Sequence, residues 1–156
     1  MKICVIGTGY VGLVSGTCFA DLGNKVYCVD RDKIKINKLK RAVSPIYESG
    51  LDDLIRSNSR AKRLYFTDDL GKAVKESQIV FICVGTPNKK KSNKVDLSFV
   101  YKAAREIAAS TKNKKIIITK STVPVGTGDE IEKILKKLKI KNIEVISNPE
   151  FLREGE

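Results

Sequence analysis

Residues 1–30 read MKICVIGTGYVGLVSGTCFADLGNKVYCVD, and this stretch decides the fold. Within it a short apolar run leads into Gly7, Gly9 and Gly12, and an apolar helical pattern begins inside the glycine loop. A GxGxxG match alone is weak evidence, but its position between a strand and a helix gives each glycine a separate task. Gly7 permits the tight turn, Gly9 lets the backbone approach a pyrophosphate, and Gly12 lets helix and strand pack closely. The sequence therefore predicts a dinucleotide site in which backbone amides at the helix start hold the phosphates.

A second apolar run, 25–30, ends in Asp30, which comes 18 residues after Gly12. A carboxylate at this point can accept hydrogen bonds from the ribose hydroxyls of an adenosine, which favours NAD. The 2′-phosphate of NADP would meet the charge of Asp30, although the adjacent Arg31 leaves NADP open as a second cofactor. A glycine turn that binds no ligand is the third alternative.

Short apolar runs alternate with helical patterns along the rest of the chain, which is typical of parallel strands joined by crossover helices. We expect strands at 2–6, 25–30, 64–66, 79–83, 115–120 and 143–146. We expect helices at 11–22, 34–41, 51–58, 69–75, 97–111 and 126–138. The predicted fold class is doubly wound α/β, Rossmann-like, with a mostly parallel sheet of about six strands.

Burial and helix ends can also be predicted. The last four strands carry Val, Ile or Phe with little alternation, as strands buried on both faces do. Asp68 is placed to cap the helix that follows it, and Asp96 precedes the helix that begins at Leu97. Gly23 stands where the first helix should stop, because glycine readily ends a helix.

Composition bounds the class of protein and its partners. Hydrophobic residues at 42% and charged residues at 31% exclude a disordered or collagen-like chain. No apolar stretch approaches the roughly 20 residues of a membrane span, and the N-terminus has no signal-peptide pattern, so we expect a cytoplasmic protein with no membrane partner. The net charge of +12 favours anionic ligands. Because the basic residues are not interleaved with aromatic ones, we expect no nucleic-acid partner.

The cysteines are Cys4, Cys18, Cys28 and Cys83. They have no CxxC or other metal spacing, and the chain contains no histidine, so we expect no metal site. All lie in apolar segments, and we expect small buried core residues in a reducing compartment. A redox or nucleophilic role is the alternative.

Five motifs, in collinear order along the whole chain, resemble one family. They are GTGYVGLVS at 7–15, PIYE at 45–48, VGTP at 84–87, KSTVPVG at 120–126 and NPEFLREG at 148–155. This set is similar to the UDP-glucose 6-dehydrogenase family of nucleotide-sugar dehydrogenases. In that family an NAD enzyme oxidises the C6 alcohol of a UDP-sugar twice to the uronic acid, through a thiohemiacetal and a thioester on a cysteine.

The resemblance implies a set of cofactor-binding residues, with Asp30 at the ribose, Lys35 on the adenosine side, and Thr86 and Thr122 toward the nicotinamide half. The full set is Gly7, Gly9, Tyr10, Val11, Gly12, Asp30, Arg31, Lys35, Val84, Gly85, Thr86, Ser121, Thr122 and Glu154. The two threonine loops should lie beyond the carboxyl ends of the strands, where ligands of open parallel sheets collect. Thr86 and Thr122 also stand beside Pro87 and Pro124, so plain turn formation is the alternative for both.

The C-terminal segment resembles the family's substrate-contacting loop, which implies substrate binding by Glu150, Phe151, Leu152, Arg153 and Glu154. The resemblance also implies supporting catalytic roles for Thr122, Glu150 and Glu154. Glu154 would lie near the cofactor and the active-site water, and Glu150 would help to hydrolyse the thioester, since a carboxylate can orient or deprotonate water. An exposed acidic chain end is the alternative for this segment.

The family's nucleophilic cysteine, and the lysine and asparagine that hold the oxyanion, come from later sequence. Cys83 does not match the cysteine motif, and we do not expect it to be the nucleophile. We expect residues 1–156 to be the NAD-binding domain of a longer homodimeric enzyme, without its central helix and UDP-binding domain. Alone, it should bind NAD without turnover and be monomeric. A GDP-mannose or UDP-N-acetyl-amino-sugar dehydrogenase domain, and a non-catalytic dinucleotide-binding module, are the alternatives.

Overall fold

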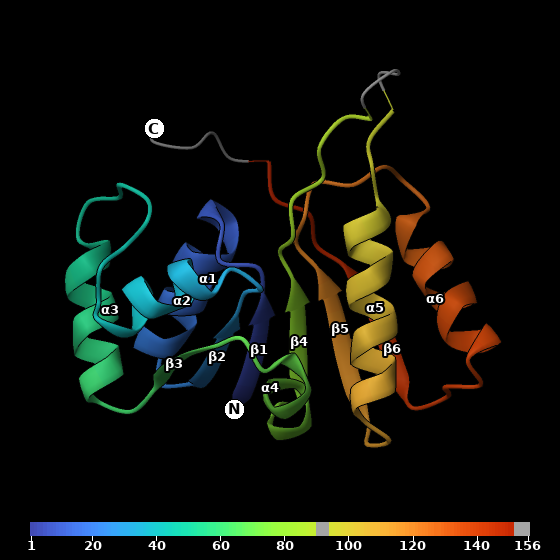
Figure 1. Ribbon diagram of the computed structural model, residues 1–156. Helices are drawn as coiled ribbons and strands as arrows, with labels where there is room; N and C mark the ends of the chain where they lie inside the picture. Colours follow the sequence, from blue (N-terminus) through green and yellow to red (C-terminus); the bar gives the residue numbers. More distant parts are fainter. Residues whose placement is uncertain (90–93, 152–156) are drawn as a thin grey trace.

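A six-stranded parallel sheet forms the centre of the computed structural model, which describes residues 1–89 and 94–151 (Figure 1). The strands are β1 (Lys2–Ile6), β2 (Lys25–Val29), β3 (Leu64–Thr67), β4 (Ile79–Ile82), β5 (Lys115–Thr119) and β6 (Ile143–Ser147). Their order is β3-β2-β1-β4-β5-β6, and each neighbouring pair is parallel. The order reverses between β1 and β4, so the predicted doubly wound, Rossmann-like fold is confirmed.

Helices cover the two faces of this sheet in two sets. The helices are α1 (Tyr10–Asp21), α2 (Lys33–Lys40), α3 (Leu51–Arg60), α4 (Leu70–Glu76), α5 (Ser98–Ser110) and α6 (Thr127–Lys137). Alternate side chains of β1 enter different cores, because successive strand residues point to opposite faces. Ile3 and Val5 pack with the helix set α1 to α3, whereas Cys4 and Ile6 pack with α4 to α6. Among the described residues, no helix is long and apolar enough to cross a bilayer.

The burial predicted for the last four strands is right only for β4, which is almost fully buried along its length. In β5, buried and half-buried residues alternate. The prediction is wrong for β6, which is an edge strand and is nowhere fully buried. Helix α6 covers one of its faces, while Ile146 on the other face is 45% exposed. β3, at the opposite edge, also alternates.

The helix ends confirm Gly23 and correct the cap of α4. Gly23 has φ +88°, and its amide donates to Ala20 O, so it ends α1 in the left-handed conformation that glycine favours. α4 is capped by Asp69, whose Oδ1 accepts from the amide of Lys72, and not by Asp68. Asp68 instead lies 3.7 Å from Lys33 Nζ.

The cysteines follow the prediction at three positions. Cys4, Cys28 and Cys83 are buried, in agreement with a core role. Cys18 is exposed, because it lies on the side of α1 that faces away from the buried residues Leu13 and Ala20. The core prediction is therefore wrong for Cys18.

Candidate cofactor site

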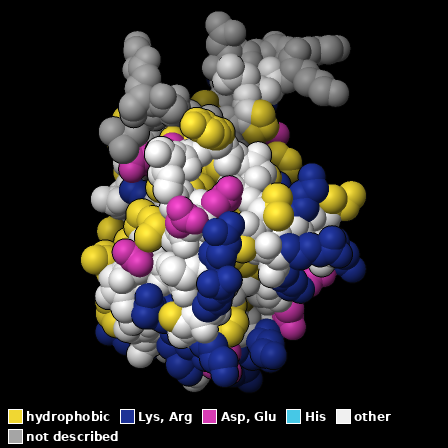
Figure 2. Space-filling view, turned by 90° about the vertical axis from the view of Figure 1, so that its left-hand side faces the viewer, with side chains coloured by type: hydrophobic (Ala, Val, Ile, Leu, Met, Phe, Trp, Pro, Cys, Tyr) yellow, Lys and Arg dark blue, Asp and Glu magenta, His cyan; other side chains and the backbone are white. Residues whose placement is uncertain are grey.

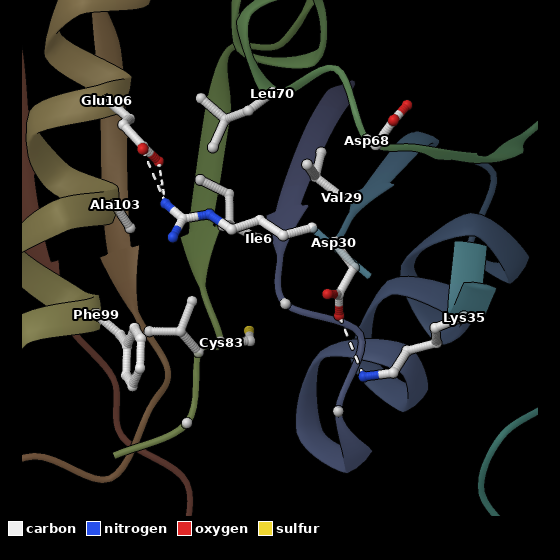
Figure 3. Close-up of a pocket in the computed structure, with 15 residues that line it drawn as sticks. Ile6, Val29, Asp30, Lys35, Asp68, Leu70, Cys83, Phe99, Ala103 and Glu106 are labelled. Atoms are coloured by element: carbon white, nitrogen blue, oxygen red, sulfur yellow. Dashed lines mark hydrogen bonds and ion pairs between the residues drawn. The ribbon is translucent and has the colours of Figure 1, made fainter. Parts of the chain in front are cut away.

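A cavity of about 510 Å³ lies at the carboxyl ends of β1, β2 and β4, where the strand order reverses (Figure 3). This switch point is where open parallel sheets bind ligands. The sequence-predicted residues in its lining are Gly7, Gly9, Asp30, Arg31, Lys35, Val84 and Gly85. Residues that the sequence did not predict come from α4 and α5 and from the ends of strands, and they include Leu70, Phe99, Ala103 and Glu106.

The glycine loop leaves room for a ligand at one position and none at the other two. Gly7 has φ +101°, and a Cβ there would lie 2.4 Å from Cys83 O. A Cβ on Gly12 would lie 2.1 Å from Gly7 O, so helix, loop and β4 are in close contact. A Cβ on Gly9 would meet nothing within 4 Å. Gly9 is the N-cap of α1 and provides no side-chain cap, so the helix start is open to a pyrophosphate.

Asp30, at the end of β2, is held by several donors. Its Oδ2 accepts from the Thr8 amide at 2.9 Å and from Thr8 Oγ1 at 2.6 Å, and its Oδ1 accepts from the Asp32 amide at 3.1 Å. Lys35 Nζ lies 3.4 Å from Oδ2. Burial acts to raise the pKa of Asp30, but the hydrogen bonds and the nearby Lys35 charge outweigh it and lower this pKa. The carboxylate is therefore ionised at neutral pH, and Oδ1, which accepts from the Asp32 amide, has a second lone pair that can accept from a ribose hydroxyl.

Thr8 is a site residue that sequence reasoning missed. It is part of the glycine loop, is completely buried, and its hydroxyl donates to Asp30. It occupies a variable position of the GxGxxG motif, so nothing in the motif indicates its role. The only available signal is its place between Gly7 and Gly9, opposite the end of the neighbouring strand.

The basic residues of the lining are both engaged with carboxylates. Arg31 Nη2 donates to both carboxylate oxygens of Glu106 at 2.8 Å, and Lys35 pairs with Asp30. Glu106 comes from α5, 75 residues along the chain, so the pair connects the end of β2 to a helix across the cavity. In Figure 3, Glu106 and Asp30 lie on opposite sides of the cavity. Sequence reasoning missed Glu106, because one acid on an amphipathic helix is no signal.

The loops after β4, β5 and β6 are joined by hydrogen bonds from two threonines. Thr86 Oγ1 donates to Thr122 O at 3.0 Å, and Thr122 Oγ1 donates to Glu150 O at 2.7 Å. Ser121 is buried, and its hydroxyl donates to Val84 O at 2.7 Å. These residues do not line the 510 Å³ cavity and lie farther along the carboxyl edge of the sheet.

Glu150 is tied to the loop after β5. Its Oε2 lies 2.9 Å from Lys120 Nζ, and its amide donates to Lys120 O at 3.1 Å. The side chains of Lys120 and Glu150 are only 15% and 24% exposed. The chain is thus anchored to the sheet as far as Glu150, which differs from an exposed acidic chain end. Phe151 is exposed, and Leu152, Arg153 and Glu154 lie outside the described residues.

Tyr10 and Val11 lie beside the cavity and not in its lining. The Tyr10 hydroxyl donates to the Glu48 carboxylate, which connects the start of α1 to the PIYE motif. Val11 is half-buried against the core on the α1 side of the sheet. The PIYE segment therefore lies near the glycine loop, although the two are 38 residues apart.

Comparison with known protein families identifies the family of this chain. Residues 1–156 match the model of the UDP-glucose/GDP-mannose dehydrogenase family, NAD binding domain. The chain belongs to this family. UDP-glucose 6-dehydrogenase of Rhizobium meliloti is 57% identical over an alignment of 156 residues that covers 99% of this chain and 36% of the relative. UDP-glucose 6-dehydrogenase TuaD of Bacillus subtilis is 53% identical, with 99% and 34% covered.

Solved structures of the family have the same fold as this NAD-binding domain. GDP-mannose dehydrogenase of Pseudomonas aeruginosa, solved as a ternary complex, has a TM-score of 0.92 at 36% identity and covers 99% of this chain and 37% of its own. UDP-glucose dehydrogenase of Pyrobaculum islandicum has a TM-score of 0.91 at 34% identity, with 98% and 36% covered. The chain thus spans about a third of the length of the curated relatives it matches. The predicted family and its cofactor, NAD, are confirmed.

Cys83 lines the cavity of this NAD-binding domain and lies next to the glycine loop. Burial raises the pKa of its thiol to about 12, despite the opposing charge of Lys120. The thiol is therefore protonated at neutral pH, and a protonated thiol is a poor nucleophile. This agrees with a packing role against Gly12, whose Cβ would lie 3.0 Å from Cys83 Cβ.

Proposed function

We propose that the chain is the NAD-binding domain of a UDP-glucose 6-dehydrogenase, which oxidises the C6 alcohol of UDP-glucose twice to UDP-glucuronate. The observation that carries this proposal is that both relatives named above with more than 50% identity, at 57% and 53%, are UDP-glucose 6-dehydrogenases. Among the solved structures, the GDP-mannose dehydrogenase is 36% identical and the UDP-glucose dehydrogenase of Pyrobaculum islandicum is 34% identical. A UDP-N-acetylmannosamine dehydrogenase of Staphylococcus aureus is 27% identical.

On the adenosine half of the cofactor, we assign Asp30 to the ribose hydroxyls, with Lys35 beside it. The support is the place of Asp30 in the cavity lining and the donors that keep it ionised. We assign the pyrophosphate to the start of α1, at Gly9. The open space at Gly9 and the absence of a side-chain cap support this assignment.

On the nicotinamide half, we assign the loops that begin at Val84 and Ser121. Val84 and Gly85 line the cavity. The hydrogen bond from Thr86 joins the loop after β4 to the loop after β5, and the hydrogen bond from Thr122 joins the loop after β5 to the loop after β6. Fixed loops can orient the nicotinamide ring toward a substrate carbon. When bound, NAD supplies the acceptor for the hydride that leaves C6.

For the sugar side, we assign Glu150 a supporting role in thioester hydrolysis. Its ion pair with Lys120 fixes the carboxylate at the carboxyl edge, where it can orient a water molecule. The nucleophilic cysteine of the family does not match any cysteine of this chain, so the domain alone should bind NAD without turnover. The substrate roles of Phe151, Leu152, Arg153 and Glu154 stay predictions.

The complete gene product that carries this domain, assayed for NADH with a panel of nucleotide sugars, tests the proposal. We expect UDP-glucose to give two equivalents of NADH per sugar, because both oxidations use the cofactor. GDP-mannose and UDP-N-acetyl-amino sugars, under the same conditions, are the controls. Faster NADH formation with one of these controls than with UDP-glucose would reject the substrate. No NADH with any sugar would favour a non-catalytic NAD-binding module.

We also propose that the complete enzyme is a homodimer. The expected cytoplasmic location stays a prediction. Sedimentation of the complete gene product tests the dimer, and a monomer that is active at the same concentration would contradict it.

A further inference from the structure

The charges of the cavity lining differ in sign from those of the chain as a whole. The chain has a net charge of +12, and Figure 2 shows Lys and Arg side chains at the lower end, in the centre and on the right-hand side of the face that it draws. Among the described residues that line the cavity, three are acidic and two are basic. They are Asp30, Asp68 and Glu106 against Arg31 and Lys35. Lys33, outside the lining, lies 3.7 Å from Asp68, so each basic residue that the structure describes at this end of the cavity faces a carboxylate and none is left free for an anionic ligand.

We propose that Glu106 is a specificity-determining residue that strengthens selection of NAD over NADP by pairing with Arg31. NADP differs from NAD in its 2′-phosphate, which carries up to two negative charges next to the ribose. Arg31 follows Asp30 directly, and a guanidinium beside this carboxylate is the group that can receive a 2′-phosphate. The proposal depends on NAD binding and not on which sugar nucleotide is oxidised.

The Arg31 side chain is oriented toward Glu106 and forms an ion pair with it. Both oxygens of the Glu106 carboxylate accept from Arg31 Nη2 at 2.8 Å, so the guanidinium is directed at α5. The side chains are 57% and 37% exposed, so the pair is at the cavity mouth and can open. If the 2′-phosphate of NADP is to bind Arg31, the ion pair between Arg31 and Glu106 must first break, which leaves the Glu106 carboxylate without its partner.

The second basic residue of the lining is no better placed to receive a 2′-phosphate. Lys35 Nζ lies 3.4 Å from Asp30 Oδ2, and both side chains are more than two-thirds buried. Asp68, a third carboxylate, completes the adenosine end and lies 3.7 Å from Lys33 Nζ. Each lining cation thus has its own carboxylate. Of these carboxylates, Glu106 is the one whose removal frees an arginine and leaves Asp30 in place.

Titration calorimetry of the Glu106→Gln variant with NAD and with NADP tests this inference. We expect NADP to bind about fivefold tighter or more, because one repelling charge is removed and one arginine is released, while the Kd for NAD changes by less than about twofold. Glu144→Gln is the matched control, since Glu144 pairs with Lys114 at 2.9 Å and is remote from the cavity lining. It changes the net charge equally and should leave the ratio of the two Kd values unchanged.

The double variant Glu106→Gln with Arg31→Gln shows whether Glu106 acts through Arg31. We expect it to lose the gain in NADP affinity. Glu106→Ala provides a second route, because alanine has the highest helix propensity and should keep α5 folded. An unchanged ratio of the Kd values for NAD and NADP in Glu106→Gln or in Glu106→Ala would overturn the proposal. So would an equal change for both cofactors, which would mean that Glu106 only shapes the adenosine wall.

Discussion

Thr8 Oγ1 donates a 2.6 Å hydrogen bond to Asp30 Oδ2, and the Thr8 amide donates to the same oxygen at 2.9 Å. These two bonds join the glycine loop after β1 to the end of β2. They orient the carboxylate before a ribose arrives, so less freedom is lost on binding. A residue inside the phosphate loop thus positions the residue that we assign to the ribose.

The first test removes the Thr8 hydroxyl in the Thr8→Val variant. Valine has nearly the same shape and suits this fully buried position, so the amide bond to Asp30 should remain. We expect NAD to bind about tenfold more weakly, because a hydrogen bond to a charged group contributes about 1.5–3 kcal/mol. Calorimetric titration measures the change.

Thr17→Val is the control for this substitution. Thr17 is a buried residue of α1 whose hydroxyl has no hydrogen-bond partner among the described residues. Its loss should leave the Kd for NAD unchanged and should not lower the free energy of unfolding by more than about 0.5 kcal/mol. Equal affinities of Thr8→Val and the wild-type chain for NAD would contradict the positioning role of Thr8.

The glycines of the loop allow folding and binding to be separated. Gly12→Ala places a methyl group 2.1 Å from Gly7 O, which is backbone and cannot move away easily. We expect the free energy of unfolding to fall by about 2–3 kcal/mol. Gly9→Ala meets nothing within 4 Å and has an ordinary φ of −72°, so the free energy of unfolding should fall by no more than about 1 kcal/mol, the cost of alanine at an N-cap.

The Gly9→Ala variant should bind NAD more weakly although it loses little stability. The added methyl group of Gly9→Ala occupies the space that we assign to the pyrophosphate, and we expect NAD to bind at least about tenfold more weakly. Urea unfolding and calorimetric titration of the same samples give both quantities. Wild-type affinity in Gly9→Ala would show that the pyrophosphate does not approach this residue.

Most of the fold could be predicted, because strand and helix periods are local properties of the sequence. All the predicted helices and strands are present, and their ends lie within two residues of the predicted ones. The error at β6 has a tertiary cause. Its sequence, IEVIS, resembles that of a buried strand, but only the sheet order decides that no strand lies beyond it.

The candidate site also has a part that could be predicted from the sequence and a part that could not. Gly7, Gly9, Gly12 and Asp30 could be predicted because a motif fixes their spacing, and each of them is at the cavity or packs the loop that forms it. The contact between Arg31 and Glu106 could not, since it joins residues 75 positions apart that share no motif. Long-range charge pairing therefore escapes an approach that relies on local patterns.

Thiol reactivity should distinguish Cys18 from the other cysteines. Burial raises the pKa values of Cys4 and Cys83 to about 12, and it also raises that of Cys28. Cys18 is exposed. A short treatment with iodoacetamide at neutral pH should give one adduct, at Cys18, because the reagent needs an accessible thiolate.

Mass spectrometry of the intact chain and of its peptides measures this result. Cys18→Ser should give no adduct in the folded state, and the wild-type chain in denaturant should give four, which is the number of cysteines in the sequence. Modification of Cys83 in the folded chain, at a rate similar to that of Cys18, would contradict the low reactivity that its burial implies.

Asp30 should make stability depend on pH in the acid range. Burial acts to raise its pKa, but bonds from Thr8 and Asp32 and the charge of Lys35 lower it below the ordinary value of 3.8. A carboxyl with a lower pKa in the folded state stabilises the protein above its unfolded-state pKa, and this contribution is lost as the pH falls through the folded-state pKa. The stability difference between the wild type and Asp30→Asn should therefore be constant from pH 7 to about 5 and shrink below about 4. Urea unfolding at each pH measures it. In a Thr8→Val background the folded-state pKa of Asp30 lies closer to its unfolded-state value, so the difference should be smaller and its loss should be complete at a higher pH. A difference that instead grows as the pH falls would contradict the assignment.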